Sequence, residues 1–188
     1  METQVIFSML DLFKRKLFKI IFWLFVVIAL PLTVLMFIGS QRYVYRAEVK
    51  IKSTAEVIFP YLYVPDQVIR WQDGVKSLSN PDNSFDRPGD TALLTLNSDD
   101  VEHSLTLKID KILPSTHLIT STESDIFKSQ TTWELKALKD HSIVQQQVVC
   151  FYGGVGRFLA PFLTSEAEQQ LQSDLERLRK TVEAEHGH

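Results

Sequence analysis

The central part of the chain, from Trp71 to Gly153, constrains the fold most, because it contains no helix-length pattern of apolar residues. Short segments in which apolar and polar residues alternate follow one another there, separated by turn-forming Pro, Gly, Asn and Asp. Such alternation is typical of half-buried β-strands, and successive strands joined by tight turns pair antiparallel. We therefore expect an antiparallel sheet with one covered face and one face exposed to water.

The same pattern gives the strand boundaries. One strand precedes the central part and the others lie within it, and the predicted ranges are 44–52, 75–78, 91–97, 101–112, 117–124, 129–138 and 143–152. Alternation over 101–112 places His103, Leu105 and Leu107 on one face of the sheet. A twisted sheet of this size curls, so its covered face is expected to be concave.

A long helix is predicted after the sheet, from Ser165 to Glu185. Its apolar residues recur at spacings of three and four and so form one stripe, and Ser165 with Glu168 has the capping-box pattern of a helix start. The glycine-rich residues 153–156 predict a hinge before it. The stripe of this helix needs an apolar surface, which the sheet supplies, and its members are Ala167, Leu171, Leu175, Leu178 and Val182.

Two short helical segments are predicted between the first and second strands. Ser53 with Glu56 has a capping-box pattern, and residues 67–71 are long enough for one further helical turn. The expected fold class is therefore α+β: a curved antiparallel sheet of about seven strands, in the order β-αα-β6-α, packed on the long C-terminal helix. An N-terminal transmembrane helix precedes it.

That transmembrane segment is predicted from Ile20 to Gly39, where 20 consecutive residues carry no charge. This length matches the roughly 30 Å of hydrocarbon in a bilayer. A cleaved signal peptide is the alternative, but its apolar core is about 7–15 residues long and small residues follow it. Phe37-Ile38-Gly39-Ser40 is a poor cleavage site, so an uncleaved anchor is favoured.

The basic flank, residues 1–19, predicts the orientation. Lys14, Arg15, Lys16 and Lys19 precede the apolar segment, and this excess keeps the N-terminus in the cytoplasm and places the C-terminal domain outside the cell membrane. Counting Lys50 and Lys52 on the far side levels the balance, so the opposite orientation stays open.

Composition excludes several classes of function. The net charge of -3 gives no electrostatic basis for binding nucleic acid. The lone cysteine, Cys150, leaves no internal disulfide, and its place in a strand favours a small core residue over a nucleophile. No Cys/His cluster has metal-ligand spacing, so we expect no metal and no cofactor.

A family resemblance runs over residues 44–185. An alternating strand leads into Ser53-Thr54-Ala55-Glu56, then Val64-Pro65-Asp66 is followed by Trp71 and Val75. Pro88-Gly89 precedes the third strand, and the closing helix carries Leu175 and Leu178. This order resembles the helix-grip domains of the START-like or SRPBCC superfamily, which includes polyketide cyclase/dehydrase-like and lipid-transfer domains. The N-terminal anchor is not part of that pattern.

The resemblance implies a domain that binds a lipid or another small hydrophobic molecule between the sheet and the last helix. It implies no shared catalytic residue set, so an enzyme is not the favoured reading. The alternatives are a cyclase- or dehydrase-type enzyme with His103 as base, and a membrane-tethered module that binds another protein. The candidate ligand-binding residues are His103, Leu105, Leu107, Trp133, Leu135, Leu171 and Leu175.

Polar residues inside the sheet could also meet a ligand. Alternation turns at least one of Gln145, Gln146 and Gln147 inward, where a buried amide needs a partner, either a ligand or a water. His103 shares its strand face with aliphatic residues, and the more ordinary role for it is a strand-end residue satisfied by backbone or water.

Overall fold

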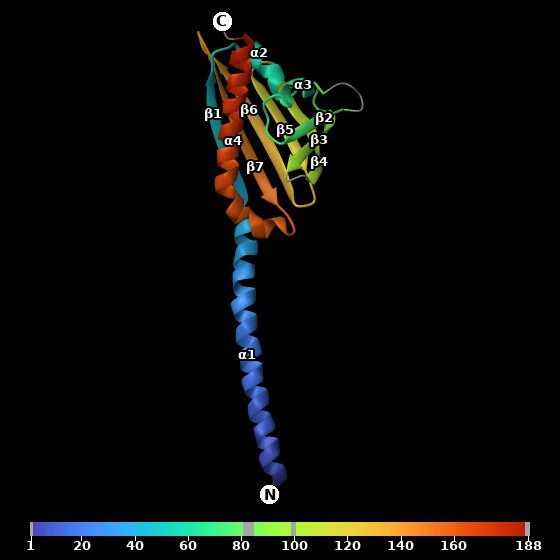
Figure 1. The fold of residues 1–188 in the computed structure, drawn as a ribbon, viewed down its shortest axis with the longest axis vertical. Coiled ribbons are helices and arrows are strands. Elements are labelled where there is room, and N and C mark those ends of the chain that lie inside the picture. The colour runs from blue at the N-terminus through green and yellow to red at the C-terminus, as the bar shows by residue number, and fades with distance from the viewer. Residues whose placement is uncertain (1, 81–84, 99–100, 187–188) are drawn as a thin grey trace.

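The computed structural model describes residues 2–80, 85–98 and 101–186, with the side chains of 2–14, 98, 101 and 163–165 left aside. A stalk formed by helix α1 (Glu2–Gly39) leads into a domain of seven strands and one long helix (Figure 1). The predicted turns at 81–83 and 99–100 lie outside the described residues. The predicted order of elements is confirmed.

The seven strands form one antiparallel sheet in the order β1-β7-β6-β5-β4-β3-β2. Every pair of neighbours in that order except β1 and β7 is consecutive in the chain, as short hairpin connections require. The strands are β1 (Arg42–Ile51), β2 (Val75–Ser79), β3 (Thr91–Ser98), β4 (Val101–Leu113), β5 (His117–Glu123), β6 (Phe127–Ala137) and β7 (Ser142–Tyr152). All seven predicted strands are present, and their ends differ from the predicted ends by at most two residues.

The last helix, α4 (Gly156–His186), begins earlier than the sequence predicts. The prediction of a start at Ser165 is wrong, because the apolar lead-in before it is itself helical and Gly156 belongs to the helix. Pro161 lies inside α4 and removes one N–H from its hydrogen-bond ladder. In Figure 1 the first turns of α4 lie across the end of α1, and the rest runs along β1.

The short helices α2 (Ala55–Ile58), η1 (Phe59–Leu62) and α3 (Pro65–Val68) lie over the end of the sheet that is far from α1 (Figure 1). The capping box predicted at Ser53 is wrong, since the N-cap residue is Thr54 and its side chain makes no capping hydrogen bond. Pro60 and Pro65 each stand in the first turn of a short helix, where a missing N–H is tolerated.

The hydrophobic core lies between the concave face of the sheet and α4. We call this face the inner face; it includes Ala47, Val49 and Ile51 of β1 and Trp133 and Leu135 of β6. From α4, the predicted stripe contributes Leu175, Leu178 and Val182, all fully buried. The alternation of burial along β1 and β6 confirms the predicted faces of these strands.

Candidate functional site

On β4, β5 and β6, burial along the inner face falls toward the end of the sheet where α1 joins it, whereas Tyr45 on β1 and Cys150 on β7 stay buried near that end. On β4, Ile109 is fully buried, Leu107 and Leu105 are half-buried, and His103 is exposed. Strands β5 and β6 repeat the gradient, since Leu118 and Trp133 are buried whereas Thr122 and Ser129 are half-buried. The inner face is thus closed at the far end and, over β4–β6, partly open at the α1 end.

The far end is filled by the protein's own side chains. Trp71 and Trp133 meet edge to face, with ring centroids 6.0 Å apart. The Trp71 indole N–H donates to the carbonyl of Tyr61 at 2.8 Å, which satisfies its buried polar atom. Leu175 and Leu178 cover this cluster from α4. A ligand of appreciable size finds no room here without displacing core side chains.

The α1 end of the inner face carries apolar residues with incomplete cover. Leu96, Leu105, Leu107 and Leu171 are half-buried and pack against the margin of the core. Leu107 pairs with Ala92 on one side and with Thr122 on the other. Apolar surface of this kind is what a hydrophobic ligand would bury.

Gln146 is the inward residue of the three glutamines. It lies on β7 between Ala47 and Trp133, and 6% of its surface is exposed. Its side-chain oxygen Oε1 accepts no hydrogen bond from any described residue. A buried acceptor without a donor costs about 1–3 kcal/mol, so this atom is a natural place for a ligand donor or a water. The prediction that one of the three glutamines points inward is confirmed.

The site residues predicted from the sequence differ in how deeply they are buried. Trp133, Leu135 and Leu175 are buried in the core, and they form the floor of the inner face. Leu105, Leu107 and Leu171 stand half-buried at the core's margin, and His103 lies exposed near the start of β4. The structure brings Leu105 and Leu107 onto one strand face with His103, as the alternation indicated.

Two groups on β7 near the α1 end have a raised pKa. Burial raises the pKa of the Cys150 thiol to about 11, so the thiol stays neutral at physiological pH. Tyr152 also has a raised pKa, first because of burial and then because of its hydrogen bond with Tyr45, whose hydroxyl lies 3.4 Å away. These groups offer neutral hydrogen-bonding atoms and no nucleophile.

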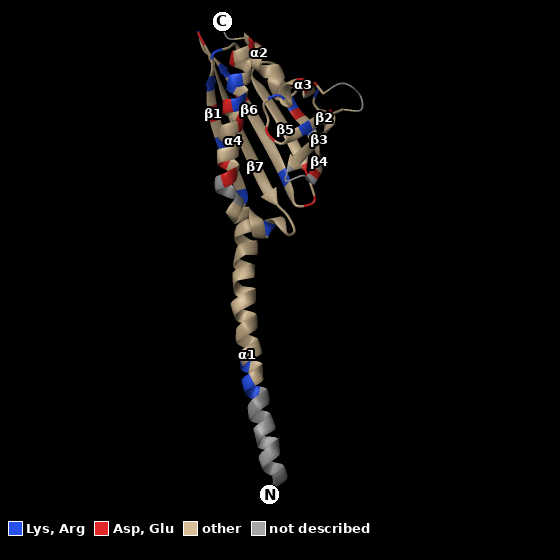
Figure 2. Ribbon diagram, viewed as in Figure 1, with Lys and Arg blue, Asp and Glu red and all other residues tan. Residues whose placement is uncertain are grey.

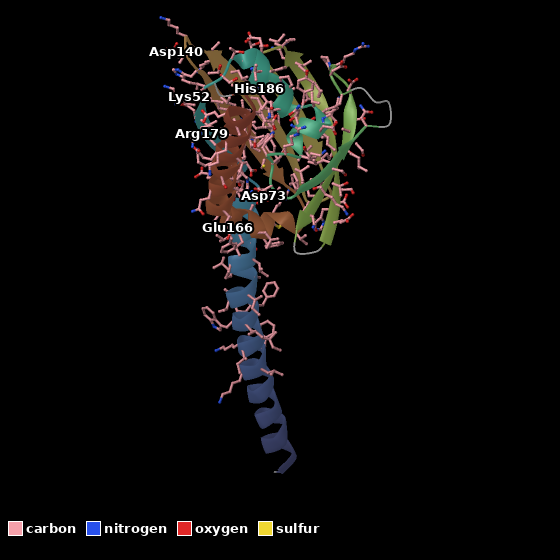
Figure 3. The ribbon with its side chains drawn as sticks, turned by 45° about the horizontal axis from the view of Figure 1, so that its top comes forward. Lys52, Asp73, Asp140, Glu166, Arg179 and His186 are labelled. Atoms are coloured by element: carbon pink, nitrogen blue, oxygen red, sulfur yellow. The ribbon has the colours of Figure 1, made fainter. Side chains whose placement is uncertain are left out.

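A charged cluster connects α4 with the turn that follows α3. Arg177 Nη2 lies 2.6 Å from Asp174 Oδ1 and 3.1 Å from Asp73 Oδ2. Burial raises the pKa of Asp174 above its ordinary value, and this outweighs the opposing effect of Arg177. Asp73, labelled in Figure 3, lies beside α4, so the ion pair with Arg177 holds the α3–β2 turn against the flank of this helix. No pattern in the sequence indicates this cluster, because Asp73 lies far from Arg177 in the chain.

A hollow of about 430 Å³ lies over β1, β7 and β6. Its lining is as apolar as it is polar, and beside outer-face residues it includes the inward Ala47 and Gln146 and Gln172 of α4. Arg46 Nε donates to Gln147 Oε1 at 2.8 Å and Gln145 Nε2 donates to Glu48, so part of the polar lining is already hydrogen-bonded. Among the described residues, no cluster of three His, Cys, Asp or Glu side chains could hold a metal ion.

Helix α1 joins the domain without a linker that could hold the two apart. A side chain at Gly39 would place its Cβ 1.7 Å from the carbonyl oxygen of Arg157, so the two backbones are in direct contact. Pro161, four residues after Arg157, cannot donate to that carbonyl. Within α1, residues Arg15–Gly39 are long and apolar enough for a membrane span or a signal sequence, and the most apolar part of this segment is not buried.

Solved structures with the same architecture identify the fold. Ara h 8.0201 superimposes with a TM-score of 0.62 at 16% identity, over 77% of this chain and 99% of that one. A START superfamily protein from Mycobacterium smegmatis gives a TM-score of 0.59 at 16% identity, over 76% of this chain and 98% of that one. The chain has the START-like, helix-grip fold.

The helix-grip domain also resembles StfQ, a di-domain ARO/CYC protein from the steffimycin biosynthetic pathway. The TM-score is 0.64 at 10% identity, and the match covers 80% of this chain and 54% of that one. No protein-family model matches the sequence, and no curated protein matches it. At these identities the likeness establishes the helix-grip architecture, which agrees with the resemblance drawn from the sequence.

Proposed function

We propose that the protein is a membrane-anchored domain, residues 44–185, that binds a lipid or another small hydrophobic molecule between the sheet and α4. One observation carries the proposal: the apolar inner face loses its cover toward α1, from buried Ile109 to half-buried Leu107 and Leu105. START-like neighbours and an ARO/CYC neighbour share the fold, which supports a binding role. The anchor, residues 20–39 of α1, keeps the domain where apolar molecules are concentrated.

The ligand's apolar part is expected to lie against Leu105, Leu107 and Leu171, above a floor of Trp133, Leu135 and Leu175. Gln146 Oε1, which has no donor among the described residues, would accept a hydrogen bond from the ligand's polar end or from a water beside it. His103 stands at the open end of the same strand face, where it could meet a polar group. No metal or cofactor is part of this proposal.

Copurified ligand tests the proposal. The full chain is extracted from membranes in detergent, washed, and its bound organic molecules are identified by solvent extraction and mass spectrometry. Leu107→Asp should abolish retention, because a carboxylate on the inner face opposes burial of an apolar molecule. Leu93→Asp is the matched control, since Leu93 lies on the neighbouring strand with 45% of its surface exposed. Equal retention by both variants, or an empty wild-type protein that binds no lipid or quinone at micromolar concentration, would contradict the proposal.

A cyclase- or dehydrase-type enzyme is the alternative that the ARO/CYC neighbour suggests. It would require His103 to act as a base on a bound substrate. Turnover that His103→Ala abolishes, with ligand binding intact, would favour that alternative. The exposure of His103 argues against it, because an exposed histidine is not shielded from water as a catalytic base at a bound substrate would be.

A further inference from the structure

Exposed apolar residues gather at the end of the domain where α1 joins it. We call them the basal patch; they come from the β5–β6 turn, the end of β7, the β7–α4 turn and the first turns of α4, and they are Ile126, Phe151, Val155, Leu159 and Phe162. Their exposed fractions run from 44% to 68%. Large apolar side chains at such exposure are ordinary when scattered, but grouped together they mark an interaction surface.

Backbone contacts show that the patch is contiguous. Gly153 N–H donates to the Ile126 carbonyl at 2.8 Å, which joins the β7–α4 turn to the β5–β6 turn. A Cβ at Gly156 would lie 2.5 Å from the same carbonyl oxygen, so the start of α4 lies directly against this turn. Phe151 pairs with Lys128 two residues beyond Ile126. Segments from three parts of the chain therefore form one surface.

The stalk fixes the depth of this surface relative to a bilayer. Residues 20–39 of α1 carry no charge (Figure 2), and as a helix they span about 30 Å, the thickness of the hydrocarbon layer. Gly39 therefore lies at the boundary between hydrocarbon and headgroups. Because Gly39 is in contact with the Arg157 backbone, the first turns of α4 lie at that boundary as well.

We propose that the basal patch is a membrane-binding surface, which inserts Val155, Leu159 and Phe162 into the headgroup region of the bilayer that α1 crosses. This inference rests on the membrane anchoring in the proposed function. A bilayer rather than a protein is the partner, because the patch is held at headgroup depth without a linker. Aromatic and aliphatic side chains beside a cation suit that layer, and Arg157, half-buried here, supplies the cation.

The position of the basal patch in the headgroup layer determines how a ligand reaches the inner face. The inner face is partly open at the α1 end, and the basal patch lies at that same end of the domain. With the patch in the headgroup layer, an apolar molecule passes between bilayer and domain without crossing bulk water. The domain then takes its ligand from the bilayer in which it is anchored, and specifically from the leaflet in contact with the basal patch.

Depth-dependent quenching tests the inference on the full chain. In a Cys150→Ala background, an environment-sensitive fluorophore is attached to the cysteine of Leu159→Cys. The labelled protein is reconstituted in phosphatidylcholine vesicles with a minor fraction of phosphatidylglycerol, and doxyl-labelled lipid in the same vesicles is the quencher. Val155→Cys is a second patch position, in case the first disturbs α4. Leu138→Cys, 51% exposed in the β6–β7 turn, is the far-end control, and Ile28→Cys, in the middle of the apolar part of α1, reports the anchor itself.

The inference predicts about twofold quenching at the patch positions, strong quenching at Ile28 and none at Leu138. Quenching at Ile28 with patch positions that behave like Leu138 would overturn the inference and leave the anchor standing. An unquenched Ile28 would remove the anchor and with it the inference. Quenching at Leu138 as strong as at Leu159 would also overturn it, because the domain would then lie flat on the bilayer.

Discussion

Gly39 determines how the stalk meets the domain. Any side chain there would overlap the Arg157 carbonyl oxygen, since a Cβ would lie 1.7 Å from it. The positions of a Cβ and of a carbonyl oxygen are both set by the backbone, so no side-chain rotation relieves the overlap, and the helices would have to separate. Pro161 contributes from the other side, because it has no N–H to donate to that carbonyl, and proline is a common cause of a bend in a helix.

We expect Gly39→Ala to loosen the junction between α1 and α4. Spin labels at Val34 and Glu168, both exposed, should give a broader distance distribution in the variant than in the parent protein reconstituted in bilayers. Ser40→Ala is the control, because Ser40 is exposed and its hydroxyl only donates to the Phe37 carbonyl. An unchanged distribution in Gly39→Ala would show that the close contact is not needed.

Gln146 gives a second prediction at this scale. Replacing it with Leu removes the unpaired acceptor, so the free energy of unfolding without ligand should rise by about 1 kcal/mol while ligand retention falls. Denaturant unfolding followed by tryptophan fluorescence measures the first effect and mass spectrometry the second. Gln147→Leu, on the outer face, should leave retention unchanged. A Gln146→Leu protein that keeps all of its ligand would remove the glutamine from the site.

At the scale of elements, α4 packs on the sheet through a short stripe of apolar residues in its later part. Leu175, Leu178 and Val182 are fully buried against the inner face, whereas Leu159 near the start of the helix is 55% exposed. The two parts of α4 therefore have different roles. The later part closes the core at the far end, and the first turns face outward beside α1.

Leu178→Ala should lower the free energy of unfolding by about 2–5 kcal/mol, because it leaves a cavity in a packed core. Leu159→Ala should lower it by less than about 1 kcal/mol, since an exposed side chain leaves no cavity. Denaturant titration of both variants in detergent gives the comparison. Equal losses would mean that the first turns of α4 are also part of the core.

The end of α4 is tied to η1 and α3, and this link responds to alkaline pH. The Tyr61 hydroxyl donates to Glu185 Oε2 at 2.6 Å, and Arg70 Nη1 lies 3.0 Å from Glu185 Oε1. Burial first, and this hydrogen bond second, raise the pKa of Tyr61 from 10.0 to about 12. Because the folded-state pKa is the higher one, its stabilisation is complete below pH 10.0 and is lost as the pH rises toward about 12.

Tyr61→Phe should lower the free energy of unfolding at neutral pH, because it removes a hydrogen bond. Between pH 10.0 and about 12, however, its free energy of unfolding should fall less than that of the parent protein. Unfolding free energies measured on either side of the interval test this. Tyr63→Phe serves as the control, because Tyr63 is half-buried and packs against Phe59 nearby. An equal alkaline loss in the parent and in Tyr61→Phe would show that other groups dominate the titration.

For the whole molecule, the proposed anchor makes the protein single-pass, and the basic flank predicts its orientation. We expect the N-terminus in the cytoplasm and residues 44–185 outside the cell membrane. A membrane-impermeant thiol reagent should label Leu138→Cys in intact cells and leave a cysteine at Thr3 unlabelled. The reverse labelling would place the domain in the cytoplasm. The proposed ligand source, the leaflet beside the domain, changes with this result.

The sequence by itself determined the elements and their order, because strand alternation, helical stripes and turn residues are local properties of the chain. It placed all seven strands, and it assigned the inward faces of β4 and β6. It placed the start of α4 too late, since Pro161 and Gly156 argue locally against a helix that the packing against α1 permits.

Only the tertiary structure decided which inner-face residues keep open surface and which are core. Trp133 and Leu107 have the same alternation in the sequence, but Trp71 covers the first, whereas the second stays half-buried. The Arg177–Asp73 link and the contact of Gly39 with Arg157 were equally inaccessible, because each joins residues more than a hundred positions apart. Burial depends on what lies opposite a side chain, and pattern along the chain does not contain that information.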